Sequence, residues 1–259
     1  MPLIRTTQTP RVWTANVISL YPEMFPGTLG SAIVGKALKE NLWILKVINM
    51  RHHGIGSHFS VDGKTSGGGP GMVLKPQVVS SAIREANKQI PKDRKLWPCI
   101  YLSPRGKLFD QAMARKLAEA NGVTILCGRF EGCDERAIEK HNFVEVSIGD
   151  FILSGGEIAA QVLIDAIVRL IPNVVGNKES IKVETFSDGL LEYPQFTKPA
   201  DWEGIKIPDI LLSGNHQNIK DWRQNMSQEL TKARRPDLWE KFKKKPKNHI
   251  NSIYKSNEK

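Results

Sequence analysis

The chain has 259 residues, of which 40% are hydrophobic and 25% charged, and 37 Lys and Arg against 27 Asp and Glu give it a formal net charge of +10. This length predicts one main domain and a smaller one, and the charge favours a polyanionic partner such as a nucleic acid, although an ordinary basic protein has a similar balance. The three cysteines are odd in number and include no C-x-x-C pair, which argues against a disulfide framework and against a zinc ribbon.

Neither the start of the chain nor its most apolar segment has the features of a targeting or membrane-spanning sequence. The first ten residues lack an apolar stretch, and Asp165 and Arg169 interrupt the longest apolar segment, 158–171. A membrane span needs about 20 apolar residues. We therefore expect a cytoplasmic protein that does not cross a membrane.

Short apolar runs alternate with helix-like patterns along the first 170 residues. Pro76 at a first-turn position, Asp110 as an N-cap and Pro172 as a stop mark helix ends. Such alternation predicts a mostly parallel sheet with helices on both faces. The predicted strands are 13–19, 43–49, 97–102, 123–127 and 143–147, and the predicted helices are 31–41, 76–89, 111–120, which Gly122 closes, and 156–170.

The C-terminal part of the chain has a different composition. Residues 176–189 show no clear period and predict an interdomain linker, whereas 190–259 contain fourteen Lys or Arg and nine Asp or Glu, a net charge of +5. Trp202, Trp222 and Trp239 alternate with basic residues on predicted helices, a composition that suits base stacking and phosphate contact. Packing inside a small helical domain is the favoured interpretation for most of these tryptophans. The predicted domains are 1–175, the linker 176–189, and 190–259.

Three segments rich in glycine and hydroxyl groups follow predicted strands, at 101–106, 127–132 and 147–157. Glycine has no Cβ, so such segments let backbone N–H and C=O groups approach a small ligand. Their spacing matches neither the dinucleotide fingerprint G-x-G-x-x-G nor a phosphate loop. Each segment alone is equally a tight turn, but the three together predict one pocket.

A further glycine-rich segment, 51–74, contains His52, His53 and His58. Two adjacent histidines do not easily face one ion, and no carboxylate stands at ligand spacing, so a polar loop is favoured over a metal site. We expect this segment to be a wall or lid that orders when a ligand binds.

Seven stretches have sequences that together resemble one known family, the TrmD family of bacterial tRNA (guanine-N(1)-)-methyltransferases. The resemblance implies an α/β SPOUT-type fold, which is a mostly parallel sheet with a deep trefoil knot, and a small α-helical C-terminal domain. It also implies a homodimer with the active site at the subunit interface, S-adenosyl-L-methionine as methyl donor, and the anticodon stem-loop of tRNA as partner. The acceptor would be the guanine just 3′ of the anticodon. The seven stretches are SLYPEMF (19–25), GGGPGM (67–72), YLSP (101–104), GRFEGCDER (128–136), SIGDFILSGGE (147–157), LLSGNH (211–216) and RRP (234–236).

The resemblance implies which residues hold the donor. Gly155 and Gly156 leave room for its methionine part, and Glu131 places a carboxylate near its sulfonium or amino group, with a solvated surface charge as the alternative. A sulfonium methyl is already electrophilic, so positioning supplies most of the catalysis. The implied donor-binding residues are Tyr101, Leu102, Ser103, Pro104, Gly128, Glu131, Ile148, Gly149, Asp150, Phe151, Ile152, Leu153, Gly155 and Gly156.

Guanine N1 carries a proton at neutral pH, so methylation needs a base. In the family this role belongs to a linker aspartate, and the alignment places Glu184 at that position. The sequence departs from the family here, because a glutamate side chain is one methylene longer than an aspartate side chain. Asp188 is the local alternative. Arg169 is implied as the cation that supports negative charge on guanine O6, and an i,i+4 ion pair with Asp165 is its alternative role.

The remaining expectations concern RNA and metal. Magnesium is implied as an assisting ion, with no residue of this chain assigned to it. Three alternatives stay open: a tRNA-binding protein whose donor pocket is catalytically silent, a nicotinamide oxidoreductase, which the missing fingerprint disfavours, and a ribose 2′-O-methyltransferase. The candidate tRNA-binding residues are Asn215, His216, Arg223, Lys232, Arg234 and Arg235.

Overall fold

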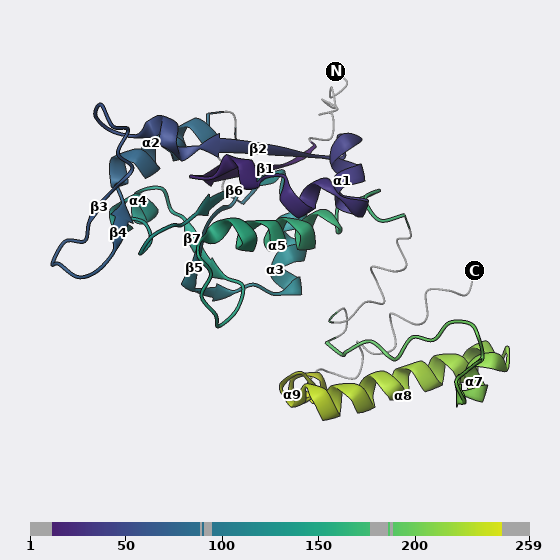
Figure 1. Ribbon diagram of the computed structural model, residues 1–259. Helices are drawn as coiled ribbons and strands as arrows, with labels where there is room; N and C mark the ends of the chain where they lie inside the picture. Colours follow the sequence, from purple (N-terminus) through teal and green to yellow (C-terminus); the bar gives the residue numbers. More distant parts are fainter. Residues whose placement is uncertain (1–11, 89, 91–94, 177–185, 187–188, 245–259) are drawn as a thin grey trace, which may run out of the picture. The chain divides into compact units, whose positions relative to one another are not determined.

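The computed structural model of the chain describes residues 12–88, 90, 95–176, 186 and 189–244. The chain divides into two compact units after Gly176 (Figure 1). Most of the predicted linker, 176–189, lies outside the described residues, and with it the candidate bases Glu184 and Asp188. None of the described helices is both long enough and apolar enough to cross a membrane.

The first unit is built on a five-stranded sheet with the order β2-β1-β6-β5-β7, in which all neighbouring strands are parallel. Every residue of the neighbouring strands β1 and β6 is buried, as expected for strands covered on both faces. The predicted parallel sheet is therefore confirmed. The strands are β1 (Trp13–Ser19), β2 (Trp43–Asn49), β5 (Cys99–Leu108), β6 (Gly122–Cys127) and β7 (Val144–Ser147), and a separate hairpin joins β3 (Asp62–Lys64) to β4 (Met72–Leu74).

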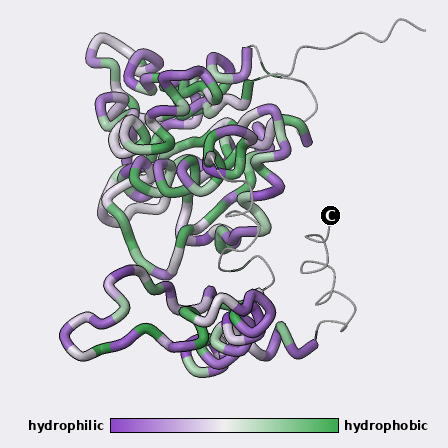
Figure 2. The backbone as a smooth tube through the Cα atoms, turned by 90° about the vertical axis from the view of Figure 1, so that its right-hand side faces the viewer, coloured by the Kyte–Doolittle hydropathy of each residue, from purple (hydrophilic) through white to green (hydrophobic). Residues whose placement is uncertain are grey.

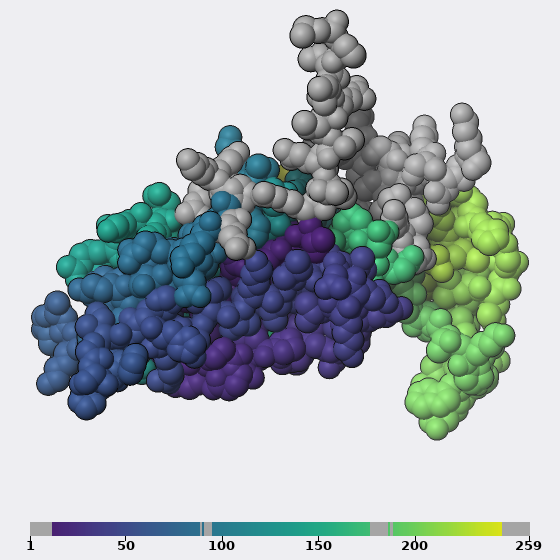
Figure 3. Space-filling view, turned by 90° about the horizontal axis from the view of Figure 1, so that it is seen from above, coloured from purple at the N-terminus to yellow at the C-terminus, as the bar shows by residue number. Residues whose placement is uncertain are grey.

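Helices cover both faces of this sheet, and apolar residues gather between the layers (Figures 1 and 2). Alternate residues of β1 enter opposite cores: Val17 packs in the core with α1, α3 and α5, and Ile18 packs in the core with α2 and α4. On the side seen in Figure 3, the N-terminal third of the chain, coloured purple to blue, forms much of the surface, because β2 is an edge strand. The helices are α1 (Ala32–Lys39), α2 (Pro76–Ala86), α3 (Gln111–Ala118), α4 (Glu135–Lys140) and α5 (Gly156–Val168), with short 3₁₀ turns at Pro22–Met24, Gly27–Gly30 and Met50–His53.

The second unit has a long helix and a small hairpin. The backbone N–H of Leu191 donates to Thr231 Oγ1 at 2.8 Å, which ties the segment before the hairpin to the long helix. Trp222 and Trp239 are half-buried against Phe196 and Phe242, whereas Trp202 is 60% exposed and does not fill a core within this unit. The elements are β8 (Asp201–Trp202), β9 (Ile205–Lys206), α7 (Asp209–Leu212), α8 (His216–Arg234) and α9 (Pro236–Lys243).

Several predicted bounds were wrong. The strand predicted at 97–102 continues to Leu108, because a bulge takes up Pro104 and Gly106, which had indicated a loop: Leu102 and Lys107 both pair with Val146. Gly122 begins β6 instead of closing a helix. The six-residue α4 was missed since it is too short for a helical period, and the predicted helices end early, that at 76–89 stopping at Ala86.

Candidate active site

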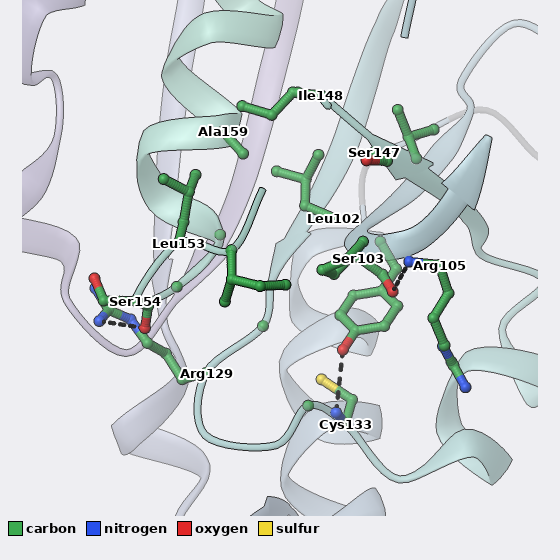
Figure 4. Close-up of a pocket in the computed structure, with 18 of the residues that line it drawn as sticks. Leu102, Ser103, Arg105, Arg129, Cys133, Ser147, Ile148, Leu153, Ser154 and Ala159 are labelled. Atoms are coloured by element: carbon green, nitrogen blue, oxygen red, sulfur yellow. Dashed lines mark hydrogen bonds between the residues drawn. The ribbon is translucent and has the colours of Figure 1, made fainter. Parts of the chain in front are cut away.

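A pocket of about 380 Å³ opens at the edge of the sheet where β6 and β7 end and α5 begins (Figure 4). In open parallel α/β sheets this carboxyl edge is the usual place for a ligand. Leu102, Ile148 and Leu153 provide apolar lining, and backbone of all three glycine-rich segments contributes to the wall. Its volume lies within the range of small-molecule sites.

The pocket brings together thirteen of the fourteen residues that were expected to hold a donor, and only the exposed Asp150 is not part of the lining. The structure establishes this proximity, while the binding roles stay predictions. The lining residues that the sequence did not single out all lie within or beside the same three segments, so their position was the available signal. They are Arg105, Arg129, Phe130, Gly132, Cys133, Glu135, Val146, Ser147, Ser154 and Ala159.

Close backbone contact forms the inner wall of the pocket. The N–H of Gly156, the first residue of α5, donates to the carbonyl of Gly128 at 2.9 Å. A Cβ at Gly156 would lie 2.8 Å from Cys127 Cα, which is too close for any side chain. Glycine at this position therefore lets the helix begin against the end of β6.

Two arginines of the wall are held by carboxylates. Arg105 lies 2.9 Å from Glu135 and 3.0 Å from Glu145. Arg129 lies 2.9 Å from Glu157, and its Nη1 donates to the Ser154 carbonyl at 3.1 Å. These contacts fix the orientation of both guanidinium groups at the pocket.

Comparison with known proteins decides the family. The family model described as "tRNA (Guanine-1)-methyltransferase TrmD" matches residues 13–241, a range that includes every residue of the pocket. The chain belongs to the TrmD family.

Similar curated proteins cover nearly the whole chain. A protein of Ruegeria sp. (strain TM1040) is 54% identical over 88% of this chain and 92% of its own length. Relatives from Jannaschia sp. (strain CCS1) and Rhodospirillum rubrum are 52% and 50% identical, over 93% and 88% of this chain and 99% and 93% of their own lengths. All three are named tRNA (guanine-N(1)-)-methyltransferase, and the family resemblance inferred from the sequence is confirmed.

Tyr101 and Cys133 both line the pocket of this TrmD-family protein. The backbone N–H of Cys133 donates to Tyr101 Oη at 3.2 Å (Figure 4). Burial raises the pKa of the Tyr101 hydroxyl far above its ordinary value and raises the pKa of the Cys133 thiol to about 12. Both groups are therefore protonated at physiological pH.

The raised pKa predicts that Cys133 resists alkylation. With a pKa of about 12 the thiolate fraction at pH 8 is about a thousandfold smaller than for an ordinary cysteine. We expect iodoacetamide at pH 8 to label Cys133 in the native protein at least about a hundredfold more slowly than after denaturation. Peptide mass spectrometry at timed intervals measures both rates. Equal rates in the two states would contradict a protonated, protected thiol.

The predicted catalytic arginine lies away from this pocket. Arg169 caps the C-terminus of α5 and lies thirteen positions after Gly156, which corresponds to about 20 Å of helix. Arg169 does not line the pocket. A single copy of the chain thus does not bring Arg169 to the proposed donor, and its role stays a prediction, as do those of Glu184 and Asp188.

The candidate tRNA-binding residues lie on or beside α8. Asn215 caps this helix by accepting the N–H of Asn218 at 3.1 Å. Spacings of seven and eleven residues place His216, Arg223 and Arg234 on one face. The Arg223 guanidinium lies 4.9 Å from the centre of the Tyr193 ring. Lys232 is exposed on another face of α8, and Arg235 forms an ion pair with Asp237.

Two of the three histidines of segment 51–74, His52 and His53, make ordinary polar contacts. His53 Nδ1 lies 2.9 Å from Ser81 Oγ and its Nε2 lies 2.8 Å from Glu85, while His52 contacts Asn49. In the part of the chain that the structure describes, no three His, Cys, Asp or Glu residues form a group suited to a metal ion.

Proposed function

We propose that this chain transfers a methyl group from S-adenosyl-L-methionine to N1 of the guanine immediately 3′ of the anticodon, as a tRNA (guanine-N(1)-)-methyltransferase. Membership of the TrmD family and the names of its relatives support this reaction. The observation that carries the proposal is the convergence of thirteen implied donor-binding residues on one pocket.

The pocket has the chemistry that this donor requires. Apolar side chains such as Leu102, Ile148 and Leu153 suit the adenine ring, and the glycine backbone around residues 155–156 suits the methionine part. Glu131 adds a carboxylate for a cationic group. The donor supplies an electrophilic methyl, and the chain binds it, orients it and excludes water.

Proton removal from guanine N1 is the step for which the chain must supply a group. Glu184 is the proposed base and Arg169 the proposed support for charge on O6, with Asp188 as the substitute base. Because Arg169 lies outside the lining of the pocket in its own chain, a site that combines donor, base and arginine calls for a second copy.

An apolar face of the first unit supports the proposed homodimer. Ile158 and Val162 are one helical turn apart on α5 and are 50% and 47% exposed, and Ile152 beside the pocket is 80% exposed. Exposed apolar side chains that lie together on a surface often mark an interaction site. A second copy on this face would cover these side chains and place the active site at the subunit interface.

The finer organisation is proposed with the reaction. Residues 1–175 would form the SPOUT domain with its deep trefoil knot, 176–189 the linker, and 190–259 the helical tRNA-binding domain. The basic face of α8 supports contact with the phosphates of the anticodon stem-loop. We place the enzyme in the cytoplasm, with magnesium as an assisting ion at a site not assigned to residues.

The test is transfer of labelled methyl from S-adenosyl-L-methionine to a tRNA transcript with guanine after the anticodon. The matched control is the same transcript with adenine at that position. We expect label only in the guanine transcript, at N1. Binding of tRNA without any transfer would instead favour the catalytically silent binding protein.

A further inference from the structure

A buried carboxylate lies directly behind the pocket. Glu157, in the first turn of α5, has no exposed surface. Its Oε1 accepts a hydrogen bond from Ser19 Oγ at 2.7 Å, and its Oε2 lies 2.9 Å from Arg129 Nε. Glu157 is not among the residues that line the pocket, so a ligand there does not touch it directly.

Arg129, in contrast, is part of the pocket wall. Its side chain is 16% exposed, and its guanidinium lies 4.4 Å from the centre of the Tyr21 ring in addition to its bond to the Ser154 carbonyl. A guanidinium is permanently charged. Without a carboxylate partner, this charge would repel a cationic ligand in the pocket, since little water screens it there.

The remaining charges of the wall favour a cation. Arg105 is paired with both Glu135 and Glu145, and Arg129 is paired with Glu157. Among the described residues, Glu131 makes no ion pair. Both arginines are thus neutralised and one carboxylate of the lining is left for the ligand.

We infer that Glu157 is a specificity-determining residue, which neutralises Arg129 and thereby makes the pocket prefer a cationic sulfonium over the neutral thioether of the same nucleoside. The inference rests on the proposed donor, because S-adenosyl-L-methionine carries the sulfonium and S-adenosyl-L-homocysteine the thioether. Methyl transfer removes this positive charge from the ligand. The pair that favours the donor therefore also favours departure of the spent product.

The test compares the dissociation constants of these two ligands by titration calorimetry. Glu157→Gln keeps the size of the side chain and an oxygen for Ser19 but leaves the Arg129 charge unpaired. We expect S-adenosyl-L-methionine to bind about tenfold more weakly and S-adenosyl-L-homocysteine less than about threefold more weakly. The double variant Glu157→Gln with Arg129→Met removes both charges and should restore the ratio of the two constants.

The matched control is Ser19→Ala, which removes the other hydrogen bond of Glu157 and changes no charge, so its ratio should equal that of the wild type. Circular dichroism at the titration temperature shows whether each variant is folded. If Glu157→Gln does not fold, Arg129→Met alone decides, because its ratio should stay equal or move toward the sulfonium.

Three outcomes are distinguishable. Equal weakening of both ligands in Glu157→Gln, without recovery of the ratio in the double variant, would overturn the inference and leave Glu157 a structural role. A shift of the ratio in Arg129→Met toward the thioether would also overturn it. Failure of the wild type to bind either ligand would instead contradict the proposed donor, on which the inference depends.

Discussion

Replacement of Glu184 by glutamine is expected to lower the rate of methyl transfer by about 10²- to 10⁴-fold, the usual contribution of a general base. Glutamine preserves the shape of the side chain but cannot accept the proton of guanine N1. Donor binding should not change, because Glu184 is not among the residues that the family resemblance implies for the donor. Single-turnover transfer at saturating donor and tRNA measures the first effect, and calorimetry with the donor measures the second.

Asp188→Asn is the matched control for this experiment, and it should transfer methyl at a rate close to that of the wild type. The opposite pattern, with activity retained in Glu184→Gln and lost in Asp188→Asn, would assign the base to Asp188. Mixing Glu184→Gln with a Gly149 variant that does not bind the donor tests the dimer. If base and donor site come from different copies, heterodimers regain up to one working site, and absence of any recovery would count against this arrangement.

Gly155→Ala is the second substitution for which we expect a large effect. A Cβ at this position would lie 2.2 Å from Arg129 Nε. Arg129 cannot easily retreat, because Glu157 and the Ser154 carbonyl hold it. We expect a loss of about 1–3 kcal/mol in the free energy of unfolding, as for other overpacked sites, and a loss of about tenfold in donor affinity, which is equivalent to about 1.4 kcal/mol.

Urea unfolding and donor titration measure these two effects. Gly176→Ala is the matched control, since its Cβ would meet no atom of the described residues within 4 Å, and it should leave both quantities unchanged. Donor affinity equal to that of the wild type in Gly155→Ala would show that Arg129 can move without consequence for the pocket. That result would also weaken the role inferred for Glu157.

The first two strands of the chain were predictable because their sequences are simple. Strands β1 and β2 have the predicted bounds, since each is a mostly apolar run that begins at a tryptophan and ends at a polar residue. The part of β5 beyond Leu102 was not predictable, because Pro104 and Gly106 indicate a turn when the sequence is considered alone. In the fold, pairing with the neighbouring strand β7 lets the strand continue through a bulge.

The residues that line the pocket were predictable from local sequence, but the contacts that support the pocket from behind were not. The glycine-rich segments can be recognised from their composition and from the family resemblance, so the sequence indicated thirteen of the lining residues. The hydrogen bond between Ser19 and Glu157 joins positions 138 residues apart, and the sequence around either residue does not indicate the other as its partner. Glu131, Arg129 and Glu157 all look like ordinary charges until the fold pairs two of them.

The order of the strands determines when the pocket can exist during synthesis of the chain. β1 is the first strand to be synthesised, yet it pairs with β6, which comes about a hundred residues later in the chain. The pairing of Thr14 with Gly122 therefore cannot form until β6 has been synthesised. The hydrogen bond from Ser19 to Glu157 forms later still, because Glu157 lies at the start of α5. A nascent chain that ends before this helix therefore lacks the pocket. The proposed donor would stabilise only the finished fold, after the slow long-range pairings have formed.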